Sequence, residues 1–184
     1  MYNKIVQCCL AAGLMMASGF SLADDAFVQQ AKTAIAKATA PVTTWDGPTQ
    51  GPALQPNKKI IFIASDMKNG GVLGVKEGLE EAAKIAGWQL DVLDGAGSVK
   101  DQLAALNQAI ARKPDGIVIG GWNPNVAKIP LKKAVKEGIV LTAWRAVPAP
   151  GPVPAYNIFY NVTSDSNEVS RMAALYAVAK SNGT

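Results

Sequence analysis

The sequence predicts an α/β fold, in which a doubly wound parallel sheet carries helices on both faces. From residue 58 onward, short apolar runs alternate with longer amphipathic segments. The run at residues 116–119 is apolar without interruption, which is typical of a strand buried on both faces. Repeated strand–helix units of this length are joined by crossover connections, and these place the strands parallel.

The first two strand–helix units have clear boundaries. We expect strands at residues 59–64 and 89–93, because both are short apolar segments followed by small polar loops. The helix after the first strand places apolar residues at helical spacing over 72–86, and Gly87 ends it. The next helix covers 99–110, with Ser98 as its N-cap.

The next elements follow the same alternation. A strand at 116–119 leads to a helix over 126–137, which accommodates Pro130 only in its first turn. Gly138 ends that helix, and a fourth strand follows at 139–143. Four prolines between 148 and 154 predict a loop, 156–162 predicts a fifth strand, and 169–180 predicts a last helix.

The first 23 residues have the order of a secretory signal peptide. Lys4 precedes an apolar run at 5–20, and small residues at 21 and 23 suit a signal peptidase, so we expect cleavage before Asp24 and a periplasmic protein. An uncleaved anchor or a buried first helix is the alternative. Cys8 and Cys9 are the only cysteines, and they precede most of the apolar run, so the exported chain would hold no disulfide and no lipid anchor.

Composition restricts the chemistry. The chain has no histidine, which removes the commonest general base and most zinc sites, and we expect no metal, no cofactor and no enzymatic activity. The net charge is +4, and the basic residues are scattered over helix faces, so we expect no nucleic-acid partner. Residues 24–57 form a separate region, a helix over 25–39 and a Pro/Gly-rich arm that Trp45 should anchor.

Several segments together carry a family resemblance: residues 59–66 (KIIFIASD), 74–87, 91–94, 113–119 (KPDGIVI) and 163–165 (TSD). In order and spacing, they resemble periplasmic sugar-binding proteins of the ribose-binding type, which serve ABC importers and have the type I periplasmic binding fold. The resemblance implies two lobes that grip a ligand between them. Residues 58–163 would form the first lobe, and 164–184 the first helix of an incomplete second lobe, so we expect this chain to bind sugar weakly or not at all.

The resemblance also implies site residues. Asn69 matches an asparagine that binds a sugar hydroxyl, Arg145 an arginine after the fourth strand, and Asp165 an aspartate near the hinge. Gly71 and Val72 stand where the family has stacking aromatics, and Trp144 stands where an aspartate is expected before the arginine. These departures leave the identity of the sugar open.

Other candidates follow from position alone, because ligands of open α/β sheets bind beyond the carboxyl ends of the strands. Asp66 follows the first strand, Trp122 and Asn123 follow the third, and Trp144 follows the fourth. Two aromatic faces would suit the C–H face of a sugar. The tryptophans could instead be core residues, and Asp66 an ordinary loop carboxylate.

The remaining alternatives are equally open. Asn69 could serve only a turn and helix start, Arg145 an ion pair, and Asp165 the N-cap of the last helix. For the whole protein we expect a monomer that binds a monosaccharide or similar small polar solute and delivers it to an ABC permease. A receptor that signals to a membrane sensor is one alternative, and a secreted α/β enzyme acting through carboxylates is another.

Overall fold

The structure is a computed structural model that describes residues 24–45 and 47–184. The signal peptide predicted at residues 1–23 lies outside the described part. Contacts divide the chain into two units, Pro41–Arg171 and a smaller one that combines the chain up to Ala40 with Met172–Thr184. The domain boundaries expected after residues 57 and 163 do not coincide with these two units. Those boundaries stay predictions.

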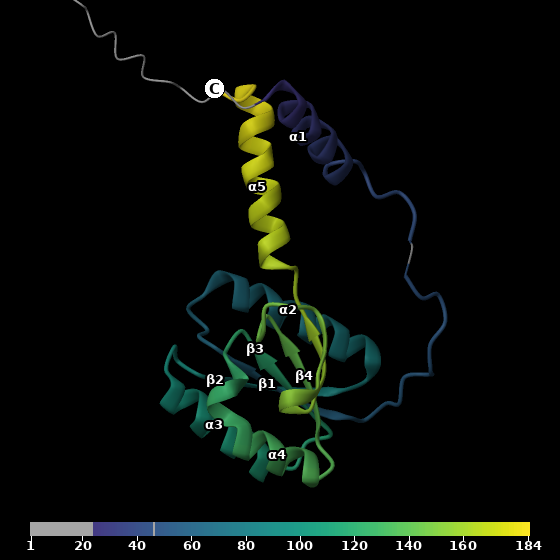
Figure 1. The fold of residues 1–184 in the computed structure, drawn as a ribbon. Coiled ribbons are helices and arrows are strands. Elements are labelled where there is room, and N and C mark those ends of the chain that lie inside the picture. Colours follow the sequence, from purple (N-terminus) through teal and green to yellow (C-terminus); the bar gives the residue numbers. More distant parts are fainter. Residues whose placement is uncertain (1–23, 46) are drawn as a thin grey trace, which may run out of the picture. The chain divides into compact units, whose positions relative to one another are not determined.

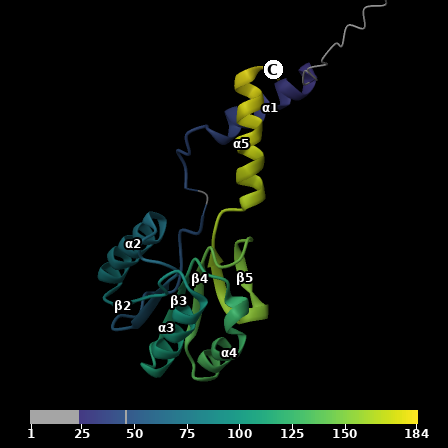
Figure 2. The ribbon, with the colours of Figure 1, turned by 90° about the vertical axis from the view of Figure 1, so that its left-hand side faces the viewer.

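The larger unit is built on a six-stranded sheet with the order β2-β1-β3-β4-β6-β5 (Figures 1 and 2). The first five strands in this order are parallel, and β5 pairs antiparallel with β6 at the edge. This confirms the α/β fold class with a parallel sheet. The strands are β1 (Lys59–Ala64), β2 (Gln89–Asp94), β3 (Gly116–Gly120), β4 (Val140–Trp144), β5 (Gly151–Val153) and β6 (Ile158–Val162).

Helices cover both faces of this sheet. On one face, α3 (Val99–Ala111) and α4 (Lys128–Lys136) bury Leu106, Ile110 and Leu131 against apolar residues of β1, β3 and β4. On the other face, α2 (Gly70–Ala86) packs Val72 against Phe62. Figure 2 shows the sheet between α2 and the pair α3 and α4.

Local capping explains where the helices begin and end. The Asn69 side chain accepts hydrogen bonds at the start of α2, and Gly87 ends this helix at a φ of 68°, where a side chain would be strained. Ser98 caps α3 as expected. Pro130 lies in the first turn of α4, where its missing N–H costs no hydrogen bond. A short 3₁₀ turn, η1 (Pro124–Ala127), precedes that helix.

Two expectations were wrong. The proline-rich segment is not only a loop, because it contains β5 and the 3₁₀ turn η2 (Pro154–Tyr156); prolines are tolerated in an edge strand that needs few donors. Trp45 does not anchor the arm, since 71% of it is exposed. Trp88 does so instead: its indole N–H donates to the carbonyl of Gln55 at 2.7 Å.

The smaller unit contains α1 (Asp25–Ala38) and the part of α5 (Ser166–Ser181) that begins at Met172. Asp24 caps α1 through a hydrogen bond from the N–H of Ala26. Among residues 24–40 and 172–184, the buried apolar ones are Val28, Ala31 and Leu175. No helix among residues 24–45 and 47–184 is both long and apolar enough to cross a membrane.

Candidate functional site

Open α/β sheets bind ligands beyond the carboxyl ends of the strands where the strand order reverses, which here is at β1 and β3; we call this edge of the sheet the crevice. From β1 the chain passes to β2 on one side, and from β2 it returns to β3 on the other side. The loops that leave β1 and β3 therefore diverge. The space between such diverging loops is the usual binding position in this fold class. The strands end in register, with Ala64 beside Gly120 and Gly120 beside Trp144. The residues that follow these three strands thus meet at one edge of the sheet.

Trp144 lies at the centre of this edge. Its ring is partly buried: it packs against the core cluster of Phe62, Ala64 and Val72, and it lies beside two glycines, Gly121 after β3 and Gly71 in the first turn of α2. A Cβ at Gly121 would lie 3.2 Å from Cζ3 of the indole, and a Cβ at Gly71 would lie 4.0 Å from Cη2. The Ser65 hydroxyl also borders Gly121, since Oγ would lie 3.2 Å from the same added Cβ. A side chain at Gly121 would therefore crowd the indole, whereas one at Gly71 would lie in ordinary contact with it.

Arg145 follows directly and is exposed. Its φ is 47°, a left-handed conformation that is uncommon for a residue with a side chain. The guanidinium carbon lies 5.9 Å from the centroid of the Trp144 ring, within the range of a cation–π contact. The backbone N–H of Arg145 donates to the carbonyl of Val162 at 2.9 Å. A planar group with several donors thus borders the indole.

Asn69 has a structural role in addition to its place at the site. Its Oδ1 accepts hydrogen bonds from the N–H groups of Gly71 at 2.8 Å and Val72 at 3.2 Å. The oxygen is therefore engaged as an N-cap, while Nδ2 makes no hydrogen bond to the described residues. Any contact from Asn69 to a ligand hydroxyl would use this amide nitrogen as donor.

The carboxylates of Asp66 and Asp94 hold the neighbouring loops. Oδ1 of Asp66 accepts from the N–H of Lys68 at 2.8 Å, and its other oxygen lies beside Gly97. Oδ1 of Asp94 accepts from the N–H of Met67 at 3.1 Å and from that of Ala96 at 2.8 Å. The structure thus places Asp66 between the loops after β1 and β2.

The two residues after β3 have different surroundings. Trp122 is only 4% exposed, lies in the core cluster with α3 and α4, and donates its indole N–H to the carbonyl of Ile63 at 3.0 Å. Asn123 caps η1, accepting from the N–H of Asn125 at 2.9 Å. Of the two tryptophans expected at the site, the structure brings only Trp144 to the crevice.

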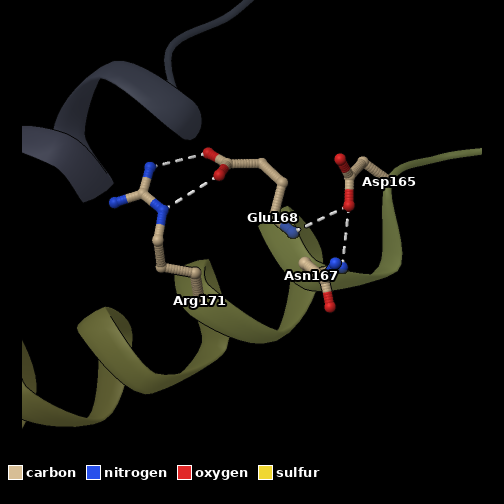
Figure 3. A network of polar contacts seen from close by, with 4 residues as sticks. All are labelled: Asp165, Asn167, Glu168 and Arg171. Carbon is tan, nitrogen blue, oxygen red and sulfur yellow. Dashed lines mark hydrogen bonds and ion pairs between the residues drawn. The ribbon is translucent and has the colours of Figure 1, made fainter. Parts of the chain in front are cut away.

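Asp165 caps the start of α5. One carboxylate oxygen accepts from the N–H of Asn167 at 2.8 Å and from that of Glu168 at 3.2 Å (Figure 3). Glu168 pairs in turn with Arg171 through two hydrogen bonds. This contact lowers the pKa of Glu168 and raises that of Arg171. The arrangement matches the N-cap alternative for Asp165.

A cavity of about 540 Å³ lies away from this crevice. It runs along the sheet face beside α2, and its lining includes Leu79, Trp88, Val118 and Val140. The polar groups in its lining include Lys58 and Asp115, which are paired with each other at 3.1 Å. The lining is mostly apolar and contains none of the residues around Trp144, so it suits a polar solute less well than the crevice does. We therefore assign the candidate site to the crevice rather than to this cavity.

Sequence reasoning missed Asn161 on β6. It is fully buried, and its side chain makes three hydrogen bonds to the segment that follows Arg145. The one signal was an amide within an otherwise apolar and aromatic strand, and amides in such positions are usually fully hydrogen-bonded. No local pattern named its partners, which lie 12 to 15 residues away in the chain.

Comparison with known proteins gives a consistent result. A family model described as a periplasmic binding protein domain matches residues 60–184, more than half of the chain. Among curated proteins, none matches the chain at a significant level.

Three solved structures share the fold. A solute-binding protein of an ABC transporter from Agrobacterium vitis with bound allitol is 25% identical, with a TM-score of 0.56; the match covers 70% of this chain and 41% of that one. GanP, a glucose-galactose binding protein from Geobacillus stearothermophilus, is 18% identical, with a TM-score of 0.60 and coverage of 71% and 45%. A sugar ABC transporter protein from Yersinia enterocolitica is 20% identical, with a TM-score of 0.60 and coverage of 74% and 42%. The chain spans less than half the length of each.

Proposed function

The chain belongs to the periplasmic binding protein family, and we propose that it is the extracytoplasmic solute-binding component of an ABC importer, with a sugar or related polyol as its solute. The observation that carries this proposal is the Trp144 indole at the crevice, with the Arg145 guanidinium beside it and the Asn69 amide and Ser65 hydroxyl next to the neighbouring Gly71 and Gly121. An apolar ring face packs against the C–H face of a sugar, and surrounding polar groups bind its hydroxyls.

The protein from Agrobacterium vitis supports the same ligand class, because it was solved with bound allitol, a polyol. Our proposal assigns ligand contacts to Asn69, Trp144 and Arg145, and adds Ser65. Asp66, Trp122, Asn123 and Asp165 are assigned structural roles, because each bonds to the backbone and, unlike Asn69, has no observation that places it beside the Trp144 indole.

Periplasmic binding proteins close two domains around their ligand by hinge motion. Residues 41–171 contain one sheet, so one wall of such a site is described here. We expect this chain to bind a polyol with a dissociation constant on the order of millimolar, about −4 kcal/mol. Binding at micromolar concentration would show that one wall is sufficient.

The test is a titration of the chain with allitol and a panel of monosaccharides, in which binding is monitored by NMR chemical shifts. Arg145→Ala and Trp144→Ala should each weaken binding by about tenfold or more, because a lost hydrogen bond or stacking contact costs on the order of 1–3 kcal/mol. Arg112→Ala is the matched control: Arg112 is also exposed, but it pairs with Asp91 far from the crevice. Shift changes that map to the cavity beside α2 would contradict the proposal.

A further inference from the structure

The segment that leaves β4 is held by one side chain of β6. Asn161 accepts a hydrogen bond at Oδ1 from the N–H of Ala146 at 3.1 Å. Its Nδ2 donates to the carbonyls of Val147 at 3.0 Å and Ala149 at 2.8 Å. Three hydrogen bonds thus join a single fully buried amide to three residues of the same loop.

The loop depends on this amide because of its prolines. Val147 and Ala149 each precede a proline, and proline has no N–H to donate to a neighbouring carbonyl. A residue before proline is also restricted to an extended backbone, which prevents the loop from closing hydrogen bonds as a helical turn would. Asn161 therefore supplies donors that the loop's own backbone lacks.

The same strand also holds Arg145 itself. The N–H of Arg145 donates to the carbonyl of Val162, and the next N–H, that of Ala146, donates to Asn161. Two neighbouring residues of β6 therefore bind the backbone on both sides of the left-handed Arg145, which has a φ of 47°. A left-handed residue with a Cβ persists only when its surroundings determine its conformation.

This conformation decides where the guanidinium lies. Successive side chains of an extended strand point to opposite faces, so a regular continuation of β4 would separate Arg145 from Trp144. Instead the guanidinium carbon lies 5.9 Å from the Trp144 ring centroid. The turn at Arg145 therefore brings its charged group to the same side as the indole.

From these contacts we infer that Asn161 is a positioning residue of the polyol site, which holds Arg145 beside Trp144 without touching the ligand. This inference rests on the proposed function, since it takes Arg145 as a ligand-binding residue. Asn161 acts through the loop backbone, so its effect on binding is transmitted entirely by Arg145.

The first test needs no ligand. A residue with positive φ gives a strong intraresidue NOE between Hα and the amide proton. In the unmodified chain Arg145 shows this NOE, and Asn161→Leu abolishes it, because all three hydrogen bonds are lost. Asn161→Ala removes the same bonds without adding bulk, and it replaces the leucine variant if that one fails to fold. A strong Arg145 NOE in the folded variant overturns the inference.

The second test is a double-mutant cycle with allitol as the probe. Asn161→Leu alone should weaken binding by about tenfold, and it should cause no further loss in the Arg145→Ala background, because the two changes act through one contact. Ile117→Val is the control, since Ile117 is fully buried in the core and away from the loop. It should lower the melting temperature and leave the affinity unchanged.

The outcomes separate the two proposals. If Arg145→Ala leaves allitol binding unchanged while Asn161→Leu abolishes the NOE, the ligand role of Arg145 fails and the positional role of Asn161 stands. If Asn161→Leu weakens binding equally with and without Arg145, the positioning inference is wrong although the site is correctly placed.

Discussion

Gly121 and the indole of Trp144 lie so close that a Cβ on the glycine would be 3.2 Å from Cζ3 of the ring. Gly121 also has a φ of 77°, a conformation that side chains rarely adopt. Two independent reasons therefore favour glycine here: its own backbone conformation, and the neighbouring indole that is proposed to face the ligand.

We expect Gly121→Ala to lower stability by about 1–2 kcal/mol from the backbone alone, and to displace the Trp144 ring. Urea unfolding measures the first effect, and NMR shifts of the indole N–H measure the second. Gly78→Ala is the matched control: Gly78 lies inside α2 with open space around its Cβ, so alanine should stabilise by roughly 0.5–1 kcal/mol. Equal stability of both variants would refute this account.

Asn69 allows capping to be separated from ligand binding. Asn69→Asp keeps an oxygen that accepts from the N–H groups of Gly71 and Val72, but removes the Nδ2 donor. We expect its stability to equal that of the unmodified chain, with weaker allitol binding. Asn69→Ala should lose about 1 kcal/mol of stability in addition. If the aspartate variant binds allitol unchanged, Asn69 serves α2 alone.

Asp115 should make stability depend on pH. The N–H of Lys59 at 2.8 Å, and then the ammonium of Lys58, lower the pKa of this carboxyl below its ordinary value. A group with a lowered folded-state pKa stabilises the protein above the unfolded pKa of about 4, and the contribution disappears as the pH falls through the folded value. Asp115→Asn should therefore be less stable than the unmodified chain at about pH 7, with the difference shrinking toward about pH 3.

Urea denaturation across this range measures the effect. Asp91→Asn is the control, because it removes the same charge from another exposed ion pair, that with Arg112. Surface pairs of this kind contribute little, so its loss should be small throughout. A loss for Asp115→Asn that stays constant down to about pH 3 would contradict the assignment.

Export is tested on the chain itself. If residues 1–23 are a signal peptide, protein recovered from the periplasmic fraction should begin at Asp24 by N-terminal sequencing. The control is a variant with Lys4→Glu, which reverses the charge before the apolar run and should slow export. Recovery of a cytoplasmic product that still carries Met1 would remove both the localisation and the receptor proposal.

The sequence alone determined the parts of this protein that depend on neighbouring residues. The run at 59–64 is β1 as expected, and Ser98 and Gly87 cap the helices that their types and positions predicted. These features could be predicted because a cap or a strand period involves residues only a few positions apart. The order of such elements was also enough to predict a parallel sheet with helices on both faces.

Only the tertiary structure decided which side chains reach the site. The sequence places Trp122 and Trp144 alike at strand ends, yet Trp122 is buried in the core with α3 and α4, whereas Trp144 packs against the smaller core cluster with only part of its surface buried and borders the crevice. The difference arises from contacts across distant segments, such as the indole N–H of Trp122 with the carbonyl of Ile63. Asn161 was not predicted for the same reason, since its three bonds cross from β6 to the loop after β4. A side chain's function here follows from partners that its own sequence neighbourhood does not contain.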